Sequence, residues 1–340
     1  MFGTSQYVCG GGGNTSVKNE TTLWVKPSGT TLKNIVADDF VDIDRAELAL
    51  LHQIEPPESP SQREVLVKDI MAQAVISKTS SRASVEAPLH DSLNSRFVVH
   101  THPAIVNGMT CAKNGASACK ELFSEALWLD YIDPGYTLCM KVRREIEQYR
   151  KKFGKEPAII FLKNHGVFVS ANSPEEIRNI YSRIMETLSK QYQSKGVSQE
   201  ISIKDLSKDF DISPFLTQLE SVFKDFCFSY SGYFDYAFGP MSPDHIVYSK
   251  SYSLIGEPTQ MAVNEFRAKH GYLPQVIVWG DLIFGVGQTK KKASLALELF
   301  KDGALVKQLA NAFGQIGFMS DSAREFIENW EVESYRSKQL

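Results

Sequence analysis

Short hydrophobic runs and helical stretches alternate along the first half of the chain. Residues 63–77 carry apolar side chains at helical spacing, which predicts a helix. Ser173-Pro174-Glu175-Glu176 combines an N-cap serine, a first-turn proline and two acidic residues, so a helix is expected from there to about Lys190. Runs rich in β-branched and aromatic residues predict strands at 23–26, 96–101, 158–162 and 167–169.

A polar stretch, residues 193–211, is poor in aromatic side chains and is the best candidate for a linker. Beyond it, a strand is expected at 246–248, and Gly280-Asp281 is expected to join the two strands of a hairpin. The pattern predicts a domain of residues 1–200 and a smaller α/β domain of residues 205–340. Further predicted elements are the hairpin strands 275–279 and 282–286 and helices at 258–269, 291–313 and 320–335.

The composition is that of an ordinary globular protein. Its charge also bears on whether the protein binds nucleic acids or membrane surfaces. Of 340 residues, 43% are hydrophobic and 23% charged, and a net charge of −3 with dispersed Lys and Arg argues against nucleic-acid or membrane-surface partners. No apolar run approaches the roughly 18–20 residues of a membrane span, and no secretory signal is visible. Five cysteines without CxxC spacing suggest reduced thiols, so a cytoplasmic location is expected.

Three histidines carry the strongest chemical signal. His100 and His102 flank one residue at the end of a predicted strand, where positions i and i+2 face the same side. Two imidazoles on one face suit zinc or a neighbouring divalent metal, although HxH pairs also arise by chance as polar strand ends. His165 ends another apolar strand and would be structural alone, but with the pair it completes a three-ligand site with an open position. Gly166 after it permits a tight turn and close approach of a ligand.

Glu86 has a predicted place beside a helix. Pro88 favours a helix start, so Glu86 would lie at the entrance of that helix. A glutamate there usually only complements the helix dipole. His90, four residues further on, is interpreted as structural.

Two glycine-containing loops are candidate anion sites. Gly10 to Gly13 precede the amide and hydroxyl groups of residues 14–16, and exposed backbone N–H groups in such a loop can form an anion nest. A second possible nest spans residues 26–31. Neither matches a Walker loop or a GxGxxG motif that opens a helix, and simple flexible loops are the alternative interpretation.

Four segments together resemble the class II aldolase/adducin family in their order and spacing, over about residues 8–195. Weaker likenesses at residues 242–248 and 328–330 extend to the aldolase portion of a bifunctional subgroup, the rhamnulose-1-phosphate aldolase/alcohol dehydrogenases. Residues 1–340 contain no dehydrogenase segment, so the resemblance implies no oxidoreductase activity here. The four segments are 11–18, 26–32, 84–90 with 100–103, and 164–166.

The resemblance implies a fold and a metal site. The expected fold is α/β, a three-layer α/β/α sandwich with a mainly antiparallel central sheet, in a homo-oligomer (dimer or tetramer). Only about ten residues precede the glycine loop, so the helix usual in the family before it is not expected. Zn²⁺, or another divalent first-row metal, would be bound by His100, His102 and His165, with Glu86 ligating or flanking the metal and acting as the base.

The resemblance also implies a phosphorylated sugar as substrate. Tyr131 and Tyr136 are both candidates for the acid that protonates the aldehyde oxygen, and Tyr131 is chosen. For each of them, a purely structural packing role is an equally open alternative. Val85 stands where phosphate-sugar aldolases often have a second serine, which weakens the phosphate assignment. The residues that would hold the phosphate are Gly13, Asn14, Ser28, Gly29 and Ser84.

The implied activity is that of a lyase. A ketose 1-phosphate of the rhamnulose or fuculose type would be cleaved through a metal-stabilised enediolate to dihydroxyacetone phosphate and a short aldehyde. Pentulose-phosphate 4-epimerisation and sugar-phosphate dehydration, both known in the superfamily, stay open as alternatives. A non-catalytic adducin-like module is disfavoured because all three histidines are present, and a dehydrogenase because no helix signal follows the glycine run.

Overall fold

The computed structural model describes residues 1–55, 57, 59–77 and 81–330. Its internal contacts divide the chain into two compact units. Among the described residues, the first comprises Met1–Val106 and Gly115–Leu188, and the second comprises Asn107–Asn114 and residues 189–330. Each unit has its own sheet and its own hydrophobic core. The predicted domain limits, 1–200 and 205–340, stay a prediction.

A seven-stranded sheet in the order β3-β2-β1-β4-β7-β6-β5 forms the centre of the first unit. Every neighbouring pair is antiparallel except β5 with β6, so the expectation of a mainly antiparallel sheet is confirmed. The strands are β1 (Asn14–Lys18), β2 (Thr22–Val25), β3 (Val41–Asp44), β4 (Phe97–Thr101), β5 (Leu127–Leu129), β6 (Ile159–Leu162) and β7 (Gly166–Ala171).

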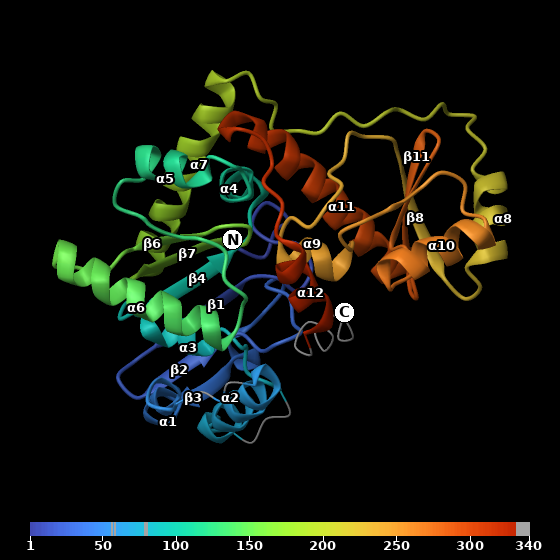
Figure 1. The fold of residues 1–340 in the computed structure, drawn as a ribbon. Coiled ribbons are helices and arrows are strands. Elements are labelled where there is room, and N and C mark those ends of the chain that lie inside the picture. Colours follow the sequence, from blue (N-terminus) through green and yellow to red (C-terminus); the bar gives the residue numbers. More distant parts are fainter. Residues whose placement is uncertain (56, 58, 78–80, 331–340) are drawn as a thin grey trace. The chain divides into compact units, whose positions relative to one another are not determined.

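Helices cover both faces of this sheet, which confirms the three-layer prediction. On one face, α3 (Ala87–Ser92) and α6 (Tyr136–Phe153) share a core with β4, β6 and β7 (Figure 1). On the other, α5 (Gly115–Leu122) and α7 (Pro174–Ser194) lie against the sheet, where Tyr181 donates its hydroxyl to the carbonyl oxygen of Val99. The remaining helical segments are η1 (Ala37–Asp39), α1 (Arg45–Ala49), η2 (Leu50–His52), α2 (Pro60–Ala74) and α4 (Ala104–Thr110).

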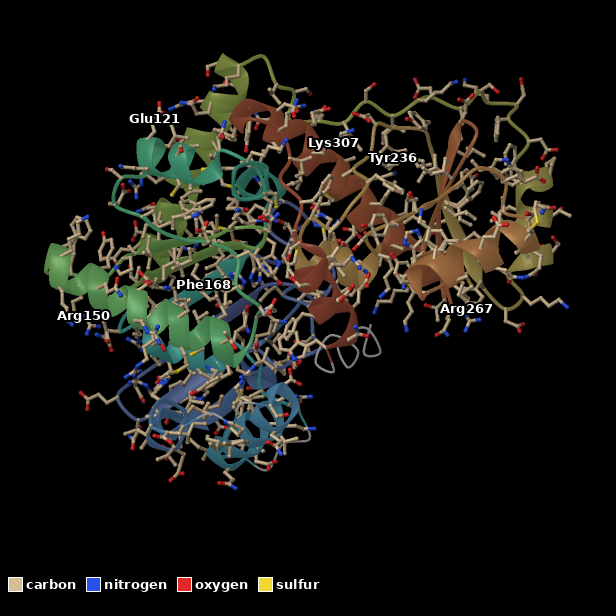
Figure 2. The ribbon with its side chains drawn as sticks, in the orientation of Figure 1. Glu121, Arg150, Phe168, Tyr236, Arg267 and Lys307 are labelled. Carbon is tan, nitrogen blue, oxygen red and sulfur yellow. The ribbon has the colours of Figure 1, made fainter. Side chains whose placement is uncertain are left out.

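The alternation of side chains along β4 decides which layer each residue joins. Val98 packs into the core beneath α3 and α6, whereas Thr101 donates its hydroxyl to Tyr181 on the opposite face. His100, two residues after Val98, therefore faces the α3 layer, and its ring stacks on Phe168 of β7 at a centroid distance of 3.8 Å. Figure 2 labels Phe168, which lies behind helix α6 in that view.

The second unit is a smaller α/β sandwich built on a four-stranded sheet in the order β8-β11-β10-β9. Side chains of α8 and α10 pack on one face, and those of α11 pack on the other. Lys307 of α11 donates to the carbonyl oxygen of Tyr236, and Figure 2 shows both. Its elements are α8 (Ser213–Val222), β8 (Cys227–Gly232), α9 (Pro243–Tyr248), β9 (Leu254–Ile255), α10 (Gln260–His270), β10 (Val276–Trp279), β11 (Leu282–Gly287), α11 (Lys290–Ala310), η3 (Asn311–Phe313) and α12 (Asp321–Asn329).

Most of the predicted elements are present, including the hairpin, in which Trp279 pairs with Leu282 across Gly280-Asp281. The strand predicted at 246–248 is wrong, because these residues end helix α9. Ser242 before the helix and Pro243 in its first turn are helix-start signals. They outweigh the strand preference of the β-branched residues Ile246 and Val247. The last five residues of the helix predicted at 320–335 lie outside the described residues.

Membrane crossing is not supported by any helix in the described part of the chain, since none combines sufficient length with sufficient apolar character.

Candidate metal centre and active site

Three strands of the first unit end at the same edge of its sheet. β4, β5 and β6 run in one direction, because β7 is antiparallel to both β4 and β6 while β5 is parallel to β6. Thr101 pairs with Val167 next to the turn that closes β6 and β7, and Leu129 pairs with Leu162. The residues that follow these strands therefore gather at one edge.

The three predicted histidines meet at this edge. The Nε2 atom of His100 lies 2.9 Å from Nε2 of His102 and 3.3 Å from Nε2 of His165. All three side chains are buried, and their ligand atoms lie within 4.8 Å of one another. Tetrahedral zinc with Zn–N bonds of about 2.05 Å separates its nitrogen ligands by roughly 3.3 Å. The cluster can hold a divalent metal ion.

The protonation of His100 favours this use. Its Nδ1 atom lies 3.0 Å from the carbonyl oxygen of Val167, which can only accept, so Nδ1 carries the proton. Nε2 then presents its lone pair to the cluster. Such a hydrogen bond to the second ring nitrogen fixes the tautomer and the orientation of a metal-ligating histidine.

The turn before β7 places His165 opposite the other two histidines. Asn164 has φ 53°, in the left-handed region that asparagine tolerates better than most residues. Gly166 follows, and a Cβ there would meet the backbone of Thr101 and come within 2.6 Å of Cδ2 of His102. Only glycine leaves room for β4 to pass this close. The sequence predicted a tight turn and the close approach of a ligand here, and the structure shows the close approach of a strand.

Glu86 lies against the histidine cluster. It is the residue before the first turn of α3, and its Oε1 atom is 3.3 Å from Nε2 of His100. Asn14 donates to Oε2 at 3.4 Å, and the backbone N–H of Glu86 donates to Oγ of Ser84 at 3.2 Å. Burial opposes ionisation of the carboxyl, but His100, then His165 and His90, outweigh it and hold the pKa of Glu86 below its ordinary value. The carboxyl group is therefore aimed at the cluster.

The segments proposed to hold phosphate lie side by side. Asn14 pairs with His100 across β1 and β4, and its side chain donates to Oγ of Ser84. The backbone N–H of Ser28 donates to the carbonyl oxygen of Arg82 at 2.8 Å, which ties the second loop to the segment that carries Ser84.

Two details correct and extend the prediction for these loops. Residues 14–16 are not part of a loop: they open strand β1, and the loop itself ends at Gly13. Gly13 has φ 66°, and a Cβ there would approach the carbonyl oxygen of His100 to 3.0 Å. Gly29, at φ 78°, is in a turn closed by Lys26, whose ammonium group donates to the carbonyl oxygen of Thr30 at 2.7 Å.

The sequence comparison agrees with this site. Residues 1–192, more than half of the chain, match the family described as the class II aldolase and adducin N-terminal domain. The chain belongs to the class II aldolase and adducin family. All the site residues described above fall within the matched segment.

Individual proteins that resemble this family member share less than 25% of its residues over the aligned segments. The chain is 23% identical to the uncharacterized oxidoreductase YuxG of Bacillus subtilis (strain 168), over 99% of this chain but only 56% of that protein. A class II aldolase domain from Thermoplasma acidophilum is 24% identical (53% of this chain, 83% of that chain, TM-score 0.45). An L-fuculose-1-phosphate aldolase from Thermus thermophilus is 14% identical (56% and 89%, TM-score 0.36). The family assignment rests on the sequence match, because neither TM-score reaches 0.5.

The two candidate tyrosines of this family member differ in their surroundings. Tyr131 follows β5 by two positions, at the edge where the histidines gather, and burial beside the Asp133 carboxyl raises its pKa. Tyr136 begins α6, and its hydroxyl donates to the carbonyl oxygen of Leu51 at 3.2 Å. The contact of Tyr136 is structural, so Tyr131 is the stronger candidate of the two.

Beneath the site lies a buried polar group that sequence reasoning only partly found. His90 is fully buried, its Nδ1 lies 2.8 Å from Oγ of Ser16, and burial lowers its pKa to about 3. Lys18, also buried, donates to the carbonyl oxygen of His90. The structural interpretation of His90 fits these contacts. Lys18 was missed, although Asn14, Ser16 and Lys18 alternate along one strand face.

Proposed function

We propose that this chain is a metal-dependent lyase that cleaves a ketose 1-phosphate of the rhamnulose or fuculose type to dihydroxyacetone phosphate and a short aldehyde. One observation carries the proposal: the carboxyl group of Glu86 lies 3.3 Å from the Nε2 atom of His100 in a cluster of three histidines. A metal-ligand set with an adjacent base is what aldol cleavage needs, whereas a non-catalytic module needs neither.

The metal in this proposal is Zn²⁺ on His100, His102 and His165. Three nitrogen ligands with one position left open for substrate are typical of catalytic zinc, and imidazole suits the late first-row metals in general. When bound, the ion would supply Lewis acidity toward the carbonyl and the adjacent hydroxyl of the ketose. The distance between Glu86 and His100 is compatible with Glu86 as a fourth metal ligand and equally with Glu86 as a base that does not bind the metal.

Glu86 would act as the base at the carbon where the bond forms and breaks. In the cleavage direction its conjugate acid returns a proton to the carbon of dihydroxyacetone phosphate that has lost the aldehyde. In the synthesis direction the carboxylate removes that proton. The contacts of its two oxygens with His100 and Asn14 hold it in one orientation for both steps. Tyr131, at the same sheet edge, would protonate the aldehyde oxygen in synthesis. In cleavage, the proton that leaves the hydroxyl group on that carbon would pass through Tyr131 or a water molecule to Glu86, which then delivers it to the carbon of dihydroxyacetone phosphate.

The phosphate would bind where the glycine loop, the turn at Gly29 and Ser84 meet. Donors in that corner include the Asn14 amide and the hydroxyl groups of Ser28 and Ser84. Val85 contributes no hydroxyl, so this corner offers one donor fewer than two adjacent serines would. A homo-oligomer, dimer or tetramer, is part of the same proposal.

YuxG is named an oxidoreductase, but this chain spans only 56% of its length, and we propose no hydride transfer here. The glycine run leads into strand β1, whereas a dinucleotide-binding fingerprint opens a helix with its N-terminus on the phosphates.

The decisive experiment is an assay of a panel of ketose 1-phosphates for release of dihydroxyacetone phosphate, with the metal present and after chelation. The proposal predicts release from at least one member that stops on chelation and returns with Zn²⁺. Isomerisation of a pentulose phosphate or loss of water from a sugar phosphate, without release of dihydroxyacetone phosphate, would instead indicate an epimerase or a dehydratase.

A further inference from the structure

The second unit contains a cavity of about 640 Å³ among residues that the proposed lyase activity does not use. It is lined by residues between 238 and 329, drawn from the turn after α9, the C-terminal end of α10 and helix α12. This volume lies within the range of pockets that hold small molecules. The groups that line it have an unusual combination of strain, charge and aromatic surface.

Lys250 is a strained lysine with an unpaired charge. Its backbone has φ 64°, a region that L-residues with long side chains rarely adopt and that costs free energy. Its ammonium group lies over the ring of Tyr272, 5.2 Å from the centroid, and no described residue forms a hydrogen bond or an ion pair with it. Burial lowers the pKa of Lys250, with the charge of Glu328 acting in the opposite direction. No described residue lies within ion-pair distance of this ammonium group, and Glu328 is the acid whose charge acts on it from beyond that distance.

Glu328 offers the complementary group, an unused acceptor. One carboxylate oxygen, Oε2, accepts from Nη1 of Arg324 at 2.7 Å. The other, Oε1, is buried and has no hydrogen-bond partner within residues 1–55, 57, 59–77 and 81–330. Arg324 also contacts Asp321 and Glu325, so its charge is already balanced. A buried carboxylate oxygen without a donor is costly unless a ligand supplies one.

An aromatic wall completes the cavity. The rings of Tyr252 and His270 stack at 4.6 Å with an interplanar angle of 29°, and Phe238 packs against Tyr252 at 5.2 Å. Burial and the nearby charges of Lys269 and Arg324 lower the pKa of His270, so its ring is uncharged at neutral pH. Such a wall favours the flat or apolar face of a ring.

We propose that this cavity binds a small hydroxylated organic anion, a sugar phosphate or a nucleoside monophosphate, at a site separate from the histidine cluster. The anionic group pairs with Lys250, a hydroxyl group donates to Oε1 of Glu328, and the ring lies along Tyr252 and His270. Each part of the ligand therefore contacts one group of the cavity: the anionic group contacts the ammonium group of Lys250, the hydroxyl contacts the carboxyl oxygen of Glu328 that has no donor, and the ring contacts the aromatic wall.

The test is calorimetric titration of the full chain with AMP, ribose 5-phosphate and inorganic phosphate. AMP or ribose 5-phosphate should bind, and inorganic phosphate should bind much more weakly because it lacks the ring. Preference for AMP would identify a nucleotide site, and equal or tighter binding of ribose 5-phosphate would identify a sugar-phosphate site. Failure of both organic probes to bind, or equal affinity for inorganic phosphate, would overturn the proposal.

Substitutions locate the binding. Lys250→Asn removes the positive charge, and asparagine tolerates the left-handed backbone conformation at this position. The affinity for the organic probe should fall about tenfold or more. Lys195→Asn, at an exposed lysine in a turn, is the matched control and should leave the affinity unchanged. Asn14→Ala should leave the affinity for AMP unchanged, because Asn14 belongs to the first unit, whereas ribose 5-phosphate could also bind at the phosphate corner proposed there. Loss of binding in Asn14→Ala but not in Lys250→Asn would place the probe at the glycine loop and refute the second site.

If Lys250→Asn melts early, Tyr252→Leu is the second variant. It removes the stacked ring from the wall and leaves both Lys250 and Glu328 in place. Binding of the organic probe should weaken severalfold. An affinity equal to that of the unsubstituted chain would refute the aromatic wall as part of the site.

Discussion

Asn14 and His100 are direct partners across strands β1 and β4, so the end of the glycine loop and a candidate metal ligand are neighbours in the sheet. Paired strands are about 4.8 Å apart. In a ketose 1-phosphate, three covalent bonds separate the phosphorus from the carbonyl carbon, and a site for this substrate must bring its phosphate and carbonyl subsites comparably close. The register of β1 on β4 provides that short separation.

The histidine cluster predicts the metal content of variants. The purified chain should hold close to one divalent ion, and His100→Ala should lose it, because two protein ligands rarely retain zinc in a catalytic site. His52→Gln, at a histidine outside the cluster, is the control and should keep its metal. Elemental analysis of protein dialysed against metal-free buffer measures both. Full occupancy in His100→Ala would show that the ion binds elsewhere.

Replacement of Glu86 should separate catalysis from metal binding. Glu86→Gln keeps the shape of the side chain but cannot accept a proton, and loss of a positioned base lowers kcat by roughly 10²–10⁴-fold. Metal content should stay unchanged because the three histidines remain. Deuterium uptake from heavy water into dihydroxyacetone phosphate isolates this proton transfer.

The control for that variant is Glu47→Gln, at an exposed acid in α1, which should exchange at the rate of the unsubstituted chain. A metal-loaded Glu86→Gln protein that also exchanged at that rate would remove Glu86 as the base.

Asn14 should matter mainly for phosphorylated substrate. Asn14→Ala removes an amide donor from the corner proposed to hold phosphate, so KM for a ketose 1-phosphate should rise strongly while KM for the unphosphorylated ketose hardly changes. Loss of the contact with Glu86 should lower kcat for both substrates to a similar extent. Steady-state kinetics with the two substrates provide the comparison. Equal losses on both would show that Asn14 only supports Glu86 and Ser84.

Lys18 predicts a stability change in mildly alkaline solution. Burial lowers its pKa in the folded chain to about 8, from the ordinary value of 10.5. Between these values the unfolded chain binds more protons than the folded chain, so the free energy of unfolding contributed by Lys18 rises with pH there and is lowest below pH 8. Lys18→Met has no group that titrates at this position. Between pH 7.5 and 10, the free energy of unfolding of the unsubstituted chain should therefore rise relative to that of the variant, by at most about 3 kcal/mol.

Urea denaturation of both proteins across that range measures the gain. Titration of tyrosines and cysteines affects both proteins alike and cancels in the difference. A difference between the two proteins that did not change with pH would mean that Lys18 titrates near its ordinary value.

The site was readable from sequence where local rules determine the geometry. His100 and His102 share a face because strand side chains alternate, and Glu86 precedes α3 because Pro88 favours a first helical turn. The contact between Glu86 and His100 is different: it depends on how α3 packs on β4, which only the resemblance to a family could suggest. Lys18 was missed because its burial depends on the same packing, and isolated lysines in a sequence usually face solvent.

The error at α9 has a related cause. Ile246 and Val247 favour a strand by intrinsic preference, but all six residues of α9 are buried, and burial on every side removes the periodicity that distinguishes helix from strand. The register of β1 on β4 was also beyond sequence reasoning, because the glycine run gave no sign that a strand begins directly after it.

His100 and His165 are 65 residues apart in the chain, and an ion bound to both would cross-link the two ends of that long loop. Such an ion would be part of the folding equilibrium as well as of the chemistry, because the unfolded chain holds no preformed site for it. The melting temperature of the first unit should then rise with free metal concentration. The cell's supply of the ion would in this way govern how much folded protein persists, before any substrate is encountered.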